Sequence, residues 1–189
     1  ERTAPGSFFA GIRPEKEVTA VIHLYCGDGK GKTTAAMGLA LRAAGHGKTV
    51  VVAQFLKAGG SGERTILAGL PTVELLPVPE QMTFTFRMTP EERAAESARE
   101  RALLEEAHRR GGEADVLGLD ELCAALSSGM VELGRVLALL DGRPPELEVV
   151  VTGRNPPPEL TARADYMTEM VKQKHPYEAG VPAGEGIEW

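Results

Sequence analysis

The fold of this chain is decided by one glycine-rich stretch, Gly27-Asp28-Gly29-Lys30-Gly31-Lys32-Thr33-Thr34. The run that precedes it, residues 18–25 (VTAVIHLY), is rich in β-branched and apolar residues and predicts a strand. The run that follows, residues 33–44 (TTAAMGLALRAA), is dense in helix formers and predicts a helix. A glycine-rich loop between a strand and a helix is the setting that a phosphate-binding loop requires.

The residue types of this loop suit an anionic ligand. Glycines let backbone N–H groups converge on a phosphate without side chains in the way, and the N-terminus of the following helix adds positive partial charge. Lys32 supplies a full positive charge to the terminal phosphates, and the Thr33 hydroxyl is placed to bind Mg²⁺. Phosphate-binding loops usually have glycine five residues before Gly31, but this chain has Cys26 there, which we expect to be a packed residue at the strand end.

Beyond this loop, strand and helix signals alternate along the chain. Apolar runs predict strands at residues 49–55, 72–76, 116–119, 147–152 and 166–171. Helix signals lie at residues 90–110, 130–140 and 157–164, and Thr89 is the N-cap of the first. This alternation predicts an α/β fold of the P-loop NTPase (RecA-like) type, with a mostly parallel sheet and helices on both faces. We expect one domain over residues 18–189, preceded by an irregular segment at residues 1–17.

The composition limits the class of protein. The chain has 21 basic and 27 acidic residues, and its net charge of -6 argues against a nucleic-acid binder. No apolar run approaches the roughly 20 residues needed to cross a bilayer, so no membrane partner is expected. The two cysteines, Cys26 and Cys123, stand far apart and form no Cys-x-x-Cys pair. We therefore expect a cytoplasmic protein without a disulfide framework.

A second functional element follows the apolar run at residues 116–119, which ends in Asp120 and Glu121. A nucleotide site of this class needs a carboxylate one strand away from the loop to hold Mg²⁺, and Asp120 or Glu121 supplies it. In a hydrolase, Glu121 would also orient a water molecule. We therefore predict Thr33, Asp120 and Glu121 as the metal-binding set. The four histidines are scattered without the spacing of metal ligands.

Several further motifs make the sequence recognisable. They are RAAGHGK (residues 42–48), VAQFLK (52–57), GER (62–64), LDEL (119–122), VTGRN (151–155), KHPY (174–177) and GIE (186–188). Together with the GDGKGKTT loop, they resemble the P-loop type of ATP:cob(I)alamin (corrinoid) adenosyltransferase, from about Val18 to Trp189. The resemblance implies transfer of the 5′-deoxyadenosyl group of ATP to the cobalt of a reduced corrinoid, with release of triphosphate, in cobalamin biosynthesis or salvage.

The resemblance also implies substrates, partners and further site residues. It implies ATP and a reduced corrinoid as substrates, Mg²⁺ as cofactor, a homodimer, and a flavoprotein as a candidate reductant. Gln54, Glu63 and Arg154 match polar positions of the family at the ATP site. For Glu63, an acidic residue favoured at a helix N-terminus is an equal interpretation. Arg154 is otherwise a surface arginine or a contact to the partner subunit.

Two phenylalanines, Phe84 and Phe86, occupy the stretch where the family has an aromatic-rich loop. The resemblance implies that they pack against the corrinoid and disfavour a lower axial ligand. The alternative is that they are core residues before the helix at 90–110. Residues 1–17 correspond to a segment that helps to cover the corrinoid in the family.

The roles expected in catalysis fall to Lys32, Thr33 and Glu121, because charge builds on the triphosphate as it leaves. Two other functions stay open at this point. One is a general P-loop NTPase or nucleotide kinase, and the other is a catalytically silent, nucleotide-dependent corrinoid-binding protein.

Overall fold

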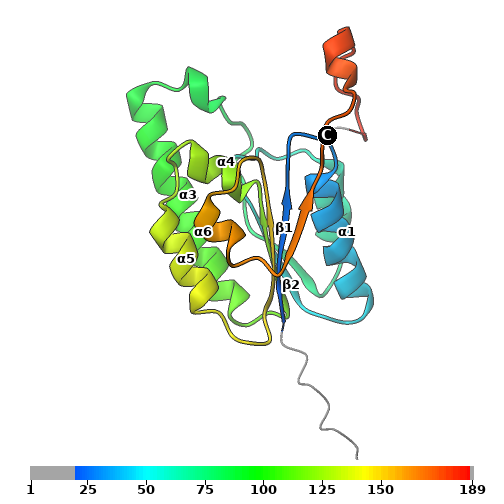
Figure 1. Ribbon diagram of the computed structural model, residues 1–189, viewed down its shortest axis with the longest axis vertical. Coiled ribbons are helices and arrows are strands. Elements are labelled where there is room, and N and C mark those ends of the chain that lie inside the picture. The colour runs from blue at the N-terminus through cyan, green and yellow to red at the C-terminus, as the bar shows by residue number, and fades with distance from the viewer. Residues whose placement is uncertain (1–19, 188–189) are drawn as a thin grey trace, which may run out of the picture.

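The protein is described by a computed structural model over residues 20–187. Six strands form one parallel sheet in the order β3-β2-β4-β5-β1-β6 (Figure 1). Their bounds are β1 (Ile22–Cys26), β2 (Val50–Gln54), β3 (Val73–Leu75), β4 (Val116–Asp120), β5 (Glu148–Thr152) and β6 (Tyr166–Glu169). Every predicted strand is present, and the P-loop NTPase-like α/β fold is confirmed. The lid predicted for residues 1–17 lies outside the described residues.

Helices connect the strands within residues 20–187. They are α1 (Lys32–Gly45), α2 (Gly62–Leu67), α3 (Pro90–Gly111), α4 (Leu122–Ser127), α5 (Leu133–Asp141) and α6 (Pro158–Thr161), with short 3₁₀ turns η1 (Thr85–Arg87) and η2 (Pro176–Ala179). The predicted start of α3 is confirmed as a capping box, in which Glu92 N donates to the Thr89 hydroxyl and Thr89 N donates to the Glu92 carboxylate. In this part of the chain, no helix is long and apolar enough to cross a membrane.

The sheet is the middle of three layers (Figure 1). One face packs against α1 and α2, through a cluster that includes Ala36, Ala40, Leu67, Val50 and Val150. The opposite face packs against α3 to α6 through a larger cluster. All five residues of β2 and of β4 are buried, as a strand covered on both faces requires. With both faces covered, the loops at the carboxyl ends of the strands are where a parallel sheet of this kind builds a ligand site.

Two differences from the predicted elements have a local cause. The helix predicted at 130–140 begins only at Leu133, because Met130 and Val131 are buried in the turn before it, where they add to the core. The strand predicted at 166–171 ends at Glu169. The next residue, Met170, still donates its N–H to Cys26 O of β1, but its carbonyl accepts from Gly29 N of the glycine-rich loop.

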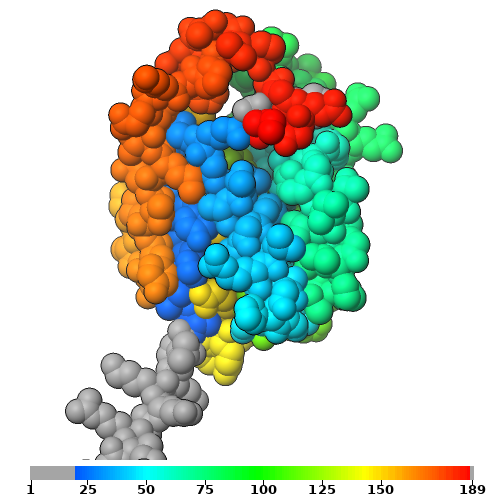
Figure 2. All heavy atoms as spheres, turned by 90° about the vertical axis from the view of Figure 1, so that its right-hand side faces the viewer, coloured from blue at the N-terminus to red at the C-terminus, as the bar shows by residue number. Residues whose placement is uncertain are grey.

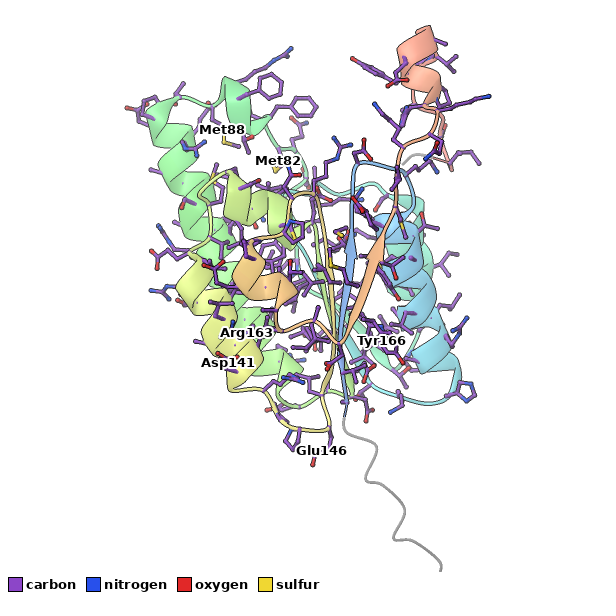
Figure 3. The ribbon with its side chains drawn as sticks, viewed as in Figure 1. Met82, Met88, Asp141, Glu146, Arg163 and Tyr166 are labelled. Carbon is purple, nitrogen blue, oxygen red and sulfur yellow. The ribbon has the colours of Figure 1, made fainter. Side chains whose placement is uncertain are left out.

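Edge strand β6 is held at its start by two side-chain contacts. Arg163, in the turn between α6 and β6, forms an ion pair with Asp141 at the end of α5, with Nε and Oδ1 2.6 Å apart (Figure 3). The Tyr166 ring stacks on His23 of β1, with ring centroids 5.0 Å apart. These contacts fix the strand whose far end reaches the glycine-rich loop.

Candidate nucleotide-binding active site

A cavity of about 500 Å³ opens among the loops that follow the strands. It is lined by Asp28, Gly29, Lys30, Gly31, Lys32, Thr33, Thr34, Met37, Lys57, Gly62, Glu63, Glu121, Arg154, His175, Gly186 and Ile187. In Figure 2 the red C-terminal residues arch over the end of α1 at which the helix begins. The glycine-rich loop, the acidic turn and the loop after β5 therefore meet in one pocket.

The glycine-rich loop, residues 27–34, is held in shape by the residue that follows β6. Gly29 N donates to Met170 O across 2.7 Å, and Met170 N donates to Cys26 O across 2.9 Å. Gly27 has φ +98°, and a Cβ there would lie 2.4 Å from Met170 O, so only glycine fits. Gly31 is the N-cap of α1 with φ +116° and offers no side-chain cap. The first N–H groups of a helix have no partner within the helix, which makes this end suited to an anion. Cys26 is buried at the strand end, as predicted.

Lys32 begins α1, and only 8% of its surface is exposed. Its ammonium donates to Gly29 O across 2.7 Å. Burial lowers the pKa of Lys32; the nearby Glu121 carboxylate opposes this shift and the Arg154 guanidinium adds to it. A partly desolvated ammonium beside a helix N-terminus is an environment that a polyanion would stabilise.

Asp120, the last residue of β4, collects three hydrogen bonds and is 2% exposed. Its Oδ1 accepts from the Thr33 hydroxyl (3.0 Å) and the Thr152 hydroxyl (2.7 Å), and its Oδ2 accepts from Gln54 Nε2 (3.0 Å). Asp120 therefore lies behind Thr33 and is absent from the cavity lining.

Of the two carboxylates in the acidic turn, Glu121 is the one that lines the cavity. Its backbone has φ +58°, a left-handed conformation that non-glycine residues seldom adopt. The conformation is held because Glu121 N donates to the Thr152 hydroxyl across 2.8 Å. Burial and the Asp120 charge raise the pKa of Glu121, while the Lys32 ammonium lowers it. A side chain kept in strained backbone and close to both a lysine and an aspartate is typical of a functional site.

The oxygen groups at this point fit a magnesium ion. The Thr33 hydroxyl and the Glu121 carboxylate line the cavity, and the Asp120 carboxylate lies one hydrogen bond behind. In nucleotide sites Mg²⁺ takes one or two protein oxygens and completes its shell with phosphates and water. Residues 20–187 contain no cluster of three or more His, Cys, Asp or Glu side chains placed to hold a metal ion by themselves.

Gln54, at the end of β2, lies beneath the cavity. It is 1% exposed and does not line the pocket. Its Nε2 is bonded to Asp120, and its Oε1 accepts from Arg64 Nη1 across 2.7 Å. The sequence predicted a direct contact between Gln54 and ATP. The buried position of Gln54 does not support that contact.

Other predicted and missed residues gather on the cavity wall. Glu63 lies in the first turn of α2, as its helix-dipole interpretation requires, and it also lines the cavity. Lys57 Nζ lies 3.3 Å from Glu63 Oε1. Arg154 is exposed and lines the cavity directly after β5. Sequence reasoning missed Lys57 and His175 as site residues, although both stand in quoted motifs.

The residues after Met170 form a C-terminal strap, residues 171–187, beside the loop. Lys172 N donates to Asp28 Oδ1 across 2.9 Å, and this bond lowers the pKa of the Asp28 carboxyl. Lys30 Nζ donates to Ile187 O across 2.9 Å. The strap therefore attaches to the loop at two points and supplies one wall of the pocket.

The aromatic pair lies outside the core. Phe84 is 64% and Phe86 is 76% exposed, so the interpretation as core residues is wrong. Their rings stack with centroids 5.5 Å apart, and the Arg87 guanidinium lies 5.4 Å from the Phe86 centroid. Met82 and Met88 flank the loop near the carboxyl end of the sheet (Figure 3). The two stacked rings are exposed and apolar, and the segment that carries them lies on the side of the molecule where the strands end (Figure 1).

Comparison with known proteins agrees with this geometry. Residues 18–189 match the model of the family described as ATP:corrinoid adenosyltransferase BtuR/CobO/CobP. The chain is 36% identical over 181 residues to a corrinoid adenosyltransferase of Pseudomonas aeruginosa, with 94% of this chain and 88% of the relative covered. It is 35% identical over 183 residues to the corrinoid adenosyltransferase CobA of Salmonella typhimurium, with 95% and 91% covered. The corresponding Escherichia coli K12 enzyme is 34% identical over the same length and coverage.

Matches of this extent cover the loop, the acidic turn and the C-terminal strap together, which a shared phosphate-binding loop alone would not produce. The NTPase or kinase alternative is therefore not favoured. The chain belongs to the ATP:corrinoid adenosyltransferase family.

Proposed function

We propose that this chain binds ATP in the cavity above the phosphate-binding loop and transfers its 5′-deoxyadenosyl group to Co(I) of a reduced corrinoid. The family assignment supports the reaction, and one structural observation supports its location in this cavity. Lys32, Thr33 and Glu121, which come from two separate motifs, line one cavity of about 500 Å³ at the N-terminus of α1. That arrangement suits a triphosphate with its metal ion.

The reaction needs no protein nucleophile, because Co(I) of the substrate is itself strongly nucleophilic. Its electron pair forms the bond to C5′ of ATP, the C5′–O bond breaks, and triphosphate leaves with the bonding electrons. Cobalt thereby becomes formally Co(III). The protein's contribution is to hold the two substrates in line and to stabilise the leaving group.

The loop residues would stabilise the departing triphosphate. Lys32 carries the charge for this, and the free N–H groups at the start of α1 add their partial charges. Mg²⁺, held by Thr33 and Glu121 with Asp120 behind, would supply further positive charge to the phosphates when bound. Arg154 stands on the wall of the same cavity and is a further phosphate contact in this proposal.

Phe84 and Phe86 would receive the corrinoid. Their support is the exposure of both rings and their stacked arrangement, which offers a flat apolar surface to a macrocycle. Contact with one face of the corrin would exclude an axial water and so ease reduction to Co(I). Reduction precedes transfer, and we propose a flavoprotein as its source.

A homodimer is also part of the proposal. All four residues of edge strand β6 are exposed, with Tyr166 at 59% and Met167 at 51%. Edge strands with apolar side chains are usually covered by another element. A second copy of the chain would provide that cover. Sedimentation analysis of the chain and of Met167→Lys, which places a charge on this edge, tests this part by itself.

The function is tested by nucleotide turnover with and without corrinoid. Consumption of ATP only when reduced corrinoid is present, at one ATP per corrinoid, is the expected result. Phosphate release without corrinoid would indicate an NTPase instead. Nucleotide binding with no turnover under either condition would indicate a silent binding protein.

A further inference from the structure

A row of polar side chains crosses the sheet beneath the cavity. The register of β2 and β4 pairs Gln54 with Asp120 as Cα partners, so the two side chains leave the sheet on the same face. Thr152 of β5 extends the row beyond Asp120. All three are at most 2% exposed. This is the face that α1 and α2 cover, and each helix contributes one member: Thr33 from α1 and Arg64 from α2.

The chemistry of the row allows only one orientation for Gln54. Arg64 has donors and no acceptor, whereas an ionised Asp120 has acceptors and no donor. A side-chain amide between them must turn its oxygen to Arg64 and its nitrogen to Asp120. The bonds of 2.7 and 3.0 Å have this polarity.

Arg64 is itself fixed away from the cavity. Its Nη2 donates to the Leu76 carbonyl across 3.1 Å, and burial lowers the pKa of the guanidinium. Arg64 does not line the cavity, although its neighbour Glu63 does. The Arg64 side chain thus bonds to Gln54 of β2 and to the turn after β3, and Gln54 connects it to Asp120 beneath the pocket.

We propose that Arg64 and Gln54 are positioning residues for Asp120, and that this relay sets how strongly Mg²⁺ supports nucleotide binding. The relay rests on the proposed function, and it adds two residues that act from behind the pocket. Because Gln54 occupies one oxygen of Asp120, the other oxygen stays directed at the hydroxyls of Thr33 and Thr152. Thr33 is thereby held with its oxygen at the cavity, and Thr152 is held where it receives Glu121 N.

Isothermal titration calorimetry of ATP, with Mg²⁺ and with EDTA, tests the relay without measuring catalysis. The quantity to compare is the ratio of the two affinities. Gln54→Met keeps the length of the side chain but removes both bonds. We expect its ratio to fall about tenfold, the size of one hydrogen bond to a charged group, while ATP binding in EDTA stays near that of the unaltered chain.

Variants of Arg64 test whether it acts through Gln54. Arg64→Met should lower the ratio by less than Gln54→Met, because Gln54 still reaches Asp120 but is free to turn. Arg64→Lys keeps a donor for Gln54 and should restore most of the ratio. In the double variant, Arg64→Met should add nothing to Gln54→Met, because the relay has Arg64 act on Asp120 through Gln54. Arg135→Met, at an exposed arginine of α5, is the matched control and should leave the ratio unchanged.

Circular dichroism and thermal unfolding of each variant separate misfolding from loss of positioning. If Arg64→Met does not fold, Gln54→Met and Arg64→Lys still decide the question. An unchanged ratio in Gln54→Met, or equal losses with Mg²⁺ and with EDTA, would overturn the relay. Additive losses in the double variant would overturn the role of Arg64. If Mg²⁺ fails to strengthen ATP binding in the unaltered chain, the proposed metal site itself is wrong, and the relay with it.

Discussion

The Thr33 hydroxyl donates a hydrogen bond of 3.0 Å to the carboxylate of Asp120, and this bond joins the two motifs that the sequence singles out. Thr33 stands in the first turn of α1, and Asp120 ends β4, which lies two places away from β1 in the sheet. The contact leaves the lone pairs of the Thr33 oxygen available at the cavity. It also makes Asp120 a residue that orients the metal site from behind.

Replacement of Lys32 by alanine should abolish adenosyl transfer. The variant loses the one ammonium that is both buried and bonded within the phosphate-binding loop. Loss of a group that stabilises transition-state charge typically lowers kcat by about 100- to 1,000-fold. Triphosphate release per corrinoid measures the effect. Near-normal turnover would remove the loop from the mechanism.

Replacement of Glu121 by glutamine should raise the Mg²⁺ concentration needed for half-maximal activity. The amide is a weaker ligand for Mg²⁺ than a carboxylate, while the backbone bond from Glu121 N to Thr152 is kept. A magnesium titration at saturating ATP measures the change, with Glu132→Gln on the exposed surface as control. A titration curve that matches the unaltered enzyme would refute the ligand role.

Replacement of Phe86 by alanine should impair the reaction most when the corrinoid is reduced on the enzyme. The exposed ring would exclude an axial ligand during reduction and has no such task once Co(I) is supplied. Rates with an enzymatic reductant and with chemically pre-reduced corrinoid are the two measurements. Leu41→Ala, at an exposed apolar residue of α1, serves as control. Equal losses in both assays would count against this role.

Gly27 should not accept even alanine. A Cβ there would lie 2.4 Å from Met170 O, and the backbone φ of +98° disfavours any side chain. We expect Gly27→Ala to destabilise the fold by about 1–3 kcal/mol. Gly38→Ala, in α1 with no atom within 4 Å of the added Cβ, should instead stabilise the helix by up to about 1 kcal/mol. Urea unfolding of both variants measures the change in the free energy of unfolding, which should decrease for Gly27→Ala and increase for Gly38→Ala.

Glu100 on α3 should make folding stability depend on pH. Its side chain is fully buried, Oε1 accepts from Leu56 N and from Arg99, and Oε2 has no partner in the described residues. Burial raises the pKa of Glu100 to about 7, against 4.5 as its ordinary value. The folded chain therefore binds the proton more tightly than the unfolded chain.

Stability should consequently fall as the pH rises from about 4.5 to 7, by about 3 kcal/mol for a shift of this size. Glu100→Gln should lose most of this dependence when the free energy of unfolding is measured at pH 5 and pH 8. Glu106→Gln, at an exposed position of α3 where the bond from Arg109 lowers the pKa, should show the same dependence as the unaltered chain. A pH profile unaffected by Glu100→Gln would contradict the assignment.

The fold followed from the sequence because its central strands are covered on both faces. Residues 49–55 and 147–152 are nearly continuous apolar runs. Such runs are typical of strands that are buried on both faces of a parallel sheet. Helices α2 and α4, of six residues each, were missed because so short a segment shows no helical period. Helix α6 (Pro158–Thr161) was predicted, but it is shorter than the expected range of 157–164. Their ends are set by packing and by the turns around them.

The residue types of the site were predictable from the sequence. Which residues line the cavity and which lie behind it was not. The motif placed Lys32 and Thr33 at the start of a helix, and it placed Glu121 after a strand. The roles of Gln54 and Arg64 depend on strand register and on the approach of α2, which no local pattern records. Lys57 and His175 reach the cavity from separate loops, so only the folded chain brings them together.

The most direct test is an anaerobic incubation of the protein with ATP, Mg²⁺ and chemically reduced corrinoid. Co(I) absorbance follows the corrinoid, and phosphorus NMR identifies the phosphate product. Loss of Co(I) with one triphosphate formed per adenosylcorrinoid is the predicted result. Formation of ADP and phosphate, with the corrinoid unchanged, would contradict the assignment of adenosyl transfer to this site.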